Sequence, residues 1–171
     1  EKKDSFCYVG GIRSFVEELN KNREEVLFPN ALYFEEKQDD TVCEVALQYN
    51  DSYSEVIYSY ANNVNTIDGG THVEGLKMAL TKVINEAGKK QNILKDNDKL
   101  TGEDVREGIT AVVSVKLVNA QFESQTKDKL NNSTIRVFVN KCVSEHMGTF
   151  LEENPSIAKE LILRCITAQE A

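Results

Sequence analysis

Tryptophan is absent from this 171-residue sequence, and proline occurs only twice, at Pro29 and Pro155. Long apolar runs are missing too, since no stretch reaches the ~18 consecutive apolar residues that a membrane-spanning helix needs. The charged start of the chain does not have the pattern of a signal peptide. The sequence also begins without methionine. We therefore expect a fragment of a longer protein that has no membrane partner.

A metal-binding pattern is likewise missing. The chain has four cysteines, Cys7, Cys43, Cys142 and Cys165, and two histidines, His72 and His146. No two cysteines form a Cys-x-x-Cys pair, and the histidines do not cluster with them, so we predict no metal site. Every cysteine except Cys7 lies in an apolar-periodic stretch, which is typical of reduced thiols in a core. Reduced thiols favour a reducing compartment such as the cytoplasm.

The chain has no excess of positive charge. Its formal net charge is −8, which argues against a protein that binds nucleic acid by itself. Residues 1–60 contribute −7 and residues 61–171 only −1. Any surface that meets phosphate is therefore expected in the second half of the chain.

Hydrophobic periodicity predicts both helices and strands in the first half. We expect a helix after Gly11, followed by three strands around residues 32–34, 43–49 and 56–60. Turn residues separate these strands, which predicts an antiparallel meander with one apolar face. A second helix should begin at Thr71, where Thr71 and Glu74 have the spacing of a capping box, and end at Gly88.

The second half is predicted to add one strand and more helix. Thr101 begins another capping-box pattern before a very short helix, and residues 109–117 alternate as a central strand. The polar segment 118–133 is too long for a tight turn, and such loops on a rigid scaffold often carry function. Two C-terminal helices should follow, over 134–152 and from Pro155. The predicted fold class is α+β, a mostly antiparallel sheet with helices on one face.

Three sequence motifs follow one another along the chain: NNVNTIDGGTH at 62–72, LTGEDVREGITAVVSVK at 100–116, and AQFESQTKDKL at 120–130. Together, at these spacings, they resemble the transducer region of the DNA gyrase B family of type IIA topoisomerases. The resemblance implies a left-handed βαβ crossover, as in one domain of a ribosomal protein, although such crossovers are nearly always right-handed.

The resemblance also implies how the chain is divided. Residues 1–133 would form the transducer body, including a Gln-Thr-Lys loop at 118–133. Residues 134–171 would form a helical extension that leads toward the DNA-cleavage (TOPRIM) region. Asp68-Gly69-Gly70 is not expected to bind nucleotide, because the family's catalytic glutamate and further glycine-rich boxes are missing from the sequence. We predict instead a tight turn into the following helix.

The Gln-Thr-Lys loop supplies the candidate site residues. In the family this lysine reaches the γ-phosphate of ATP bound in the preceding domain, which makes Lys127 the candidate catalytic residue and phosphate ligand. Gln125 would be the second contact, through a neutral hydrogen bond. An ammonium on a flexible stem can sense the third phosphate and offset charge that develops during hydrolysis. Ser124 and Ala120 depart from the family's glycine and proline, which leaves the loop's resting conformation open.

Basic residues punctuate the two C-terminal helices, at Arg136, Lys141, Lys159 and Arg164. The family's dimer encloses a cavity in which basic side chains face DNA, so the resemblance makes these four residues DNA-facing candidates. The alternative interpretation, that they lie on solvated helix faces, stays open for each of them.

The function that the resemblance implies is to sense the ATP γ-phosphate and to couple ATP binding and hydrolysis to DNA strand passage and negative supercoiling. ATP and Mg²⁺ would be held mainly by the preceding ATPase domain, so the fragment alone is expected to hold neither and to be inactive. The implied partners are that ATPase domain, a second B subunit, the gyrase A subunit and double-stranded DNA, in the bacterial cytoplasm or an organellar equivalent. The alternatives are the equivalent domain of topoisomerase IV or of a mismatch-repair ATPase, and an RNA-binding module of the same fold.

Overall fold

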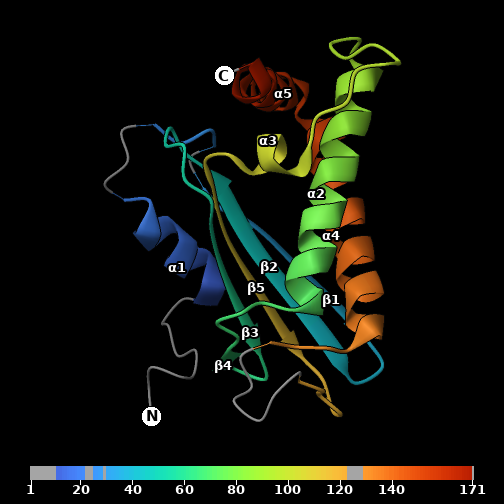
Figure 1. The fold of residues 1–171 in the computed structure, drawn as a ribbon. Coiled ribbons are helices and arrows are strands. Elements are labelled where there is room, and N and C mark those ends of the chain that lie inside the picture. The colour runs from blue at the N-terminus through green and yellow to red at the C-terminus, as the bar shows by residue number, and fades with distance from the viewer. Residues whose placement is uncertain (1–10, 22–24, 29, 123–128, 171) are drawn as a thin grey trace.

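The computed structural model describes residues 11–21, 25–28, 30–122 and 129–170. It contains one five-stranded sheet with helices packed against it (Figure 1). The elements are α1 (Gly11–Leu19), β1 (Leu32–Gln38), β2 (Thr41–Tyr49), β3 (Val56–Ala61), β4 (Val64–Asn65), α2 (Thr71–Lys90), α3 (Gly102–Arg106), β5 (Ile109–Lys116), α4 (Ser133–Glu153) and α5 (Pro155–Glu170). The predicted α+β class is confirmed.

The strand order is β1-β2-β5-β3-β4, and every neighbouring pair is antiparallel except β3 with β5. The predicted meander of the first three strands is therefore wrong, because β5 lies between β2 and β3. The reason is that residues 109–115 of β5 are buried on both faces, which only a central strand can achieve. The parallel pair β3 and β5 is joined through α2 and α3, so a crossover exists. Its left-handedness stays a prediction.

The two faces of the sheet carry separate apolar clusters. Val45 and Val113, which are register partners, belong to the larger cluster with α2, α4 and α5. The neighbouring pair Ala46 and Val112 faces the other way and packs with α1. Figure 1 shows α1 and the α2–α4 pair on opposite sides of the sheet. The prediction of helices on one face is thus corrected: apolar residues at consecutive positions of β2 and β5 require a cover on both faces.

The two ends of α2 differ from the sequence prediction. Thr71 does not cap the helix. Gly70 occupies the cap position, and the buried Thr71 Oγ1 has no hydrogen-bond partner within the described structure. The helix also continues past Gly88 to Lys90. Gly88 serves packing instead of termination, since a Cβ there would lie 2.6 Å from the Leu94 Cδ1 atom. By contrast, the capping box of α3 is confirmed, because Thr101 and Asp104 exchange both of its hydrogen bonds.

The C-terminal helices pack onto the same core as the sheet. Asn154 interrupts them, and Pro155 begins α5 as predicted. Three of the four cysteines, Cys43, Cys142 and Cys165, are free and buried, as expected of core thiols, and Cys7 lies outside the described residues. Among the helices that the structure describes, none is long and apolar enough to cross a membrane.

Candidate functional site

The predicted Gln-Thr-Lys loop leaves β5 and returns to α4, and its two arms are described while its centre is not. Gln125, Lys127 and Ser124 lie outside the described residues. The arms are paired with each other through a bridge between Phe122 and Leu130 and a hydrogen bond of 2.7 Å from the Asn131 amide to the Gln121 carbonyl. The segment that holds both candidate phosphate contacts is therefore closed at its base by a short antiparallel pair.

Asn132 reinforces this base. Its side-chain oxygen accepts a hydrogen bond of 2.6 Å from the Gln121 amide, and its side-chain nitrogen donates one of 3.0 Å to the Asn119 carbonyl. Asn132 also occupies the cap position of α4, yet it makes no side-chain capping bond there. An asparagine at this place usually caps the helix. Here both of its polar atoms hold the opposite arm of the loop.

Leu130 docks the base of the loop onto the start of α2. Its amide donates to the Gly69 carbonyl at 3.0 Å, and its carbonyl accepts from the Thr71 amide at 3.1 Å. The side chain is buried in the main core. A Cβ at Gly70 would lie 2.5 Å from the Leu130 nitrogen and closer still to its carbonyl oxygen, and Gly70 has φ +137°. Only glycine permits this approach.

The first and third sequence motifs therefore meet in space. The predicted tight turn at Asp68-Gly69-Gly70 is confirmed by the hydrogen bond from the Gly69 amide to the Thr66 carbonyl and by φ +77° at Gly69. Sequence reasoning missed that this turn holds the loop. The Gly-Gly pair signals a special backbone conformation, but no periodicity reveals a contact across about sixty residues with Leu130.

His72 lies behind this turn and belongs to the core. Its Nε2 atom is 3.0 Å from the Thr66 hydroxyl, which in turn is 2.7 Å from the Ser59 hydroxyl. Burial lowers the pKa of His72 from 6.5 to about 4, so the ring is neutral at physiological pH. A neutral, fully buried ring is not placed to bind a phosphate, so His72 has a structural role.

The four basic candidates for DNA contact lie on α4 and α5 in different surroundings. Arg136 pairs with Glu74 on α2 through its Nε and Nη2 atoms, at 2.8 and 2.7 Å. Arg164 donates to the backbone carbonyl of Asn50. Lys141 and Lys159 are exposed, and Lys141 shares a small hollow with two glutamates of β1 and α4. The two arginines thus bind within the chain, whereas the two lysines point to solvent.

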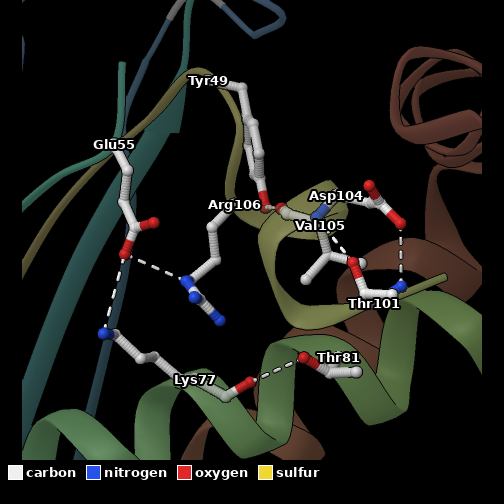
Figure 2. A network of polar contacts seen from close by, with 8 residues as sticks. All are labelled: Tyr49, Glu55, Lys77, Thr81, Thr101, Asp104, Val105 and Arg106. Atoms are coloured by element: carbon white, nitrogen blue, oxygen red, sulfur yellow. Dashed lines mark hydrogen bonds and ion pairs between the residues drawn. The ribbon is translucent and has the colours of Figure 1, made fainter. Parts of the chain in front are cut away.

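The second sequence motif builds a polar network at the other end of the sheet, which Figure 2 shows. Glu55 pairs with Arg106 of α3 at 2.9 Å and with Lys77 of α2 at 3.7 Å. The Tyr49 hydroxyl, at the end of β2, donates to the Val105 carbonyl at 2.6 Å. Helix α3 is consequently tied to β2, to α2 and to the segment before β3.

No group of three His, Cys, Asp or Glu side chains is placed to hold a metal ion in the part of the chain that the structure describes. The described residues therefore form two features. One is the base on which the 118–133 loop docks, and the other is the polar network around α3.

Comparison with known proteins places this architecture in a family. The family model described as DNA gyrase B matches residues 11–171. The DNA gyrase subunits B of Clostridium acetobutylicum and Enterococcus faecalis are 53% and 48% identical to the chain, which they cover completely. The chain spans only 27% of the length of each of these relatives.

Solved structures agree. The 43K ATPase domain of Thermus thermophilus gyrase B, in complex with an aminocoumarin, superposes with a TM-score of 0.85 at 35% identity, over 95% of this chain and 44% of that one. The topoisomerase IV ATP-binding domain of Francisella tularensis gives 0.81 at 25% identity, over 95% and 43%. With a family model that covers nearly every residue and the fold matched over almost the whole chain, this chain belongs to the DNA gyrase B family.

Proposed function

We propose that this chain is the transducer region of a gyrase B subunit and that its 118–133 loop reports the γ-phosphate of ATP bound in the domain that precedes it. The observation that carries the proposal is the docking of Leu130 onto Gly69–Gly70. A loop that must reach a neighbouring domain and respond to one phosphate needs a fixed base. The second and third fixing contacts are the Phe122–Leu130 bridge and the two hydrogen bonds of Asn132.

Lys127 and Gln125 are the proposed contacts to the nucleotide. They lie between the two arms that Leu130 and Asn132 fix, so the ordering cost of placing them is reduced before the nucleotide arrives. The Lys127 ammonium would bind the triphosphate state more strongly than the diphosphate state. Such a difference in affinity between states is what a ligand-driven switch requires.

The rest of the chain would carry the response onward as one body. The main core extends without a break from Leu130 to Ile162 of α5, so displacement of the loop base would move the sheet and the helices together. We propose that residues 1–133 form the body, with a left-handed crossover from β3 to β5, and that 134–171 lead toward the DNA-cleavage region. We propose that this shared movement couples ATP binding and hydrolysis to strand passage and negative supercoiling.

The proposed partners and cofactors belong to the whole subunit. The ATPase domain of the same chain would hold ATP and Mg²⁺. A second B subunit, the A subunit and double-stranded DNA would complete the assembly in the cytoplasm. Lys141 and Lys159, which are exposed, are the DNA-facing candidates with side chains directed to solvent.

Replacement of Lys127 by alanine in the full-length subunit tests the proposal. We expect ATP-dependent supercoiling by the reconstituted holoenzyme to fall by about 10²-fold or more, because one charge-stabilising donor is lost from the reacting phosphate. Lys129→Ala removes the same charge from the same loop and serves as the matched control, with activity near wild type. The isolated chain sets the baseline, and we expect it to show no magnesium-dependent ATP hydrolysis. Wild-type rates of supercoiling and ATP hydrolysis in Lys127→Ala would contradict the proposal.

The equivalent domain of topoisomerase IV is the second candidate, favoured by the structural similarity to the Francisella tularensis protein. The two candidates differ in the reaction of the holoenzyme. Introduction of negative supercoils into relaxed plasmid would identify gyrase, whereas relaxation and decatenation alone would identify topoisomerase IV.

A further inference from the structure

We propose that Arg164 is a positioning residue that fastens α5 to the end of the sheet opposite the loop base, and that it acts in transmission instead of contacting DNA. This inference rests on the proposed function and assigns a second residue to it. Figure 1 shows the two ends: the start of α2 lies at one end of the sheet, and α3 and α5 lie at the other.

The first support is a junction centred on Asn50, the residue that follows β2. The Arg164 side chain donates to the backbone carbonyl of Asn50. The backbone amide of Asn50 donates to the Gly108 carbonyl at 2.8 Å. The side-chain nitrogen of Asn50 donates to the Asn20 side chain at 2.9 Å and lies 3.3 Å from the Thr110 hydroxyl. Asn50 is 2% exposed. One buried residue therefore connects β2, β5, the end of α1 and α5.

The second support is the space kept for the guanidinium. Gly108 has φ +84°, and a Cβ there would lie 2.8 Å from the Asn50 carbonyl oxygen and 3.3 Å from the Arg164 Nη2 atom. A side chain at position 108 would thus press on both partners of the Arg164 contact. Glycine satisfies the backbone conformation and leaves this space open.

A second attachment of α5 lies nearby. Gln169 donates to the Lys99 carbonyl at 2.9 Å, just before α3 begins. Helix α3 is itself held by the Tyr49, Glu55 and Lys77 contacts of Figure 2. Helix α5 is therefore attached at two points to the same end of the molecule, directly to β2 and indirectly through α3.

The charges around Arg164 argue against DNA contact. The hollow that it lines also contains four carboxylates, those of Glu25, Asp51, Glu107 and Glu160. A phosphate backbone that approached this hollow would meet four negative charges for one positive charge, and affinity for DNA depends on the opposite balance. Lys95, in the segment before α3, is exposed and has no proposed role in DNA contact, so it serves as the control for the loss of one cation.

The test uses the full-length subunit with its A partner. The measured quantities are ATP hydrolysed per change in linking number and the DNA concentration that half-saturates the ATPase. For Arg164→Ala we expect ATP hydrolysis within about twofold of wild type but roughly tenfold less supercoiling per ATP, with unchanged half-saturation by DNA. Arg164→Lys, which keeps a donor for the carbonyl, should recover most of the coupling. Lys95→Ala should leave both the ratio of ATP to supercoiling and the half-saturation by DNA unchanged.

Two outcomes would overturn the proposal. One is wild-type coupling in Arg164→Ala. The other is weaker half-saturation by DNA with intact coupling, which would make Arg164 a DNA contact. If Arg164→Ala does not fold, Gln169→Ala tests the same attachment at an exposed position, and its coupling ratio must worsen. Lys127→Ala is measured in parallel. Supercoiling retained in Lys127→Ala overturns the proposed function, whereas supercoiling lost there but kept in Arg164→Ala overturns only the α5 attachment.

Discussion

Gly70 allows the loop base to dock onto the start of α2, because it has no side chain. It lies against the backbone of Leu130 with φ +137°, so alanine would meet both a steric clash and an unfavourable backbone conformation. We expect Gly70→Ala to release the loop base, to lower stability by at least ~1 kcal/mol, and to reduce ATP-dependent supercoiling in the full-length subunit. Hydrogen exchange of the Leu130 and Thr71 amides measures the release directly.

Gly148→Ala is the control for this change. Gly148 lies within α4, and a Cβ there would meet no atom within 4 Å. Alanine should therefore stabilise the helix, by about 0.5–1 kcal/mol. If the Leu130 amide stays as protected in Gly70→Ala as in the wild type, the docking interpretation is wrong.

At this scale the sequence predicted the turn but not its partner. The Gly-Gly pair after Asp68 has a local signature, because left-handed backbone conformations favour glycine. Leu130 and Asn132 have none. In the sequence, Leu130 is one apolar residue at the end of a polar segment, and Asn132 is one of several polar residues there. Their roles arise from contacts with distant segments, which only the folded chain brings together.

Two threonines at helix starts allow a paired prediction at the scale of elements. The Thr101 side chain accepts from the Asp104 amide at 3.3 Å in the capping box of α3, so Thr101→Ala should cost about 1 kcal/mol of unfolding free energy. The buried Thr71 hydroxyl has no partner in the described structure. Thr71→Val keeps its shape and should be neutral or stabilising. Urea denaturation of each variant gives the comparison, and a larger loss for Thr71→Val than for Thr101→Ala would refute the assignment of caps.

The elements themselves were predictable where periodicity is strong, and their arrangement was not. The apolar stripes of α2 and α4 and the alternation of β2 and β5 appear directly in the sequence. Pairing partners do not, because β3 can pair with β2 or with β5 at equal local cost. What decides between them is the burial of β5 on both faces. An apolar residue on the second face of the strand, Val112, indicates this central position. Helix α1 packs over that face and buries Val112.

At the scale of the whole molecule, the two ends of the sheet are built in different ways, which fits the different tasks proposed for them. The loop base at the start of α2 is built by backbone contacts, and the α5 attachment is built by a buried polar junction and an ion-pair network. A close-packed core lies between them. Packed cores are displaced as units and are hardly deformed. Movement imposed at the loop base would therefore appear at α5 with little loss, provided that Arg164 keeps its contact.

The stability of the whole chain should depend on pH through His72. Burial lowers its pKa to about 4 in the folded state, whereas the unfolded chain has the ordinary value near 6.5. Between these pH values the unfolded state binds more protons, so stability must fall as pH decreases from about 6.5 to about 4. The shift corresponds to roughly 3 kcal/mol at its limit.

The variant His72→Gln isolates this effect, because glutamine keeps a polar group for the Thr66 hydroxyl but does not titrate. Carboxylates contribute their own acid dependence to both proteins, so the difference between the two profiles is the informative quantity. The unfolding free energies of the wild type and of His72→Gln are measured by urea denaturation at several values between pH 4 and pH 8. The two values should converge toward acid pH, because the wild type loses more stability than the variant as the pH decreases. Parallel profiles would mean that His72 is charged, or exposed, in the folded chain, and the buried cluster with Thr66 and Ser59 would then have to be reinterpreted.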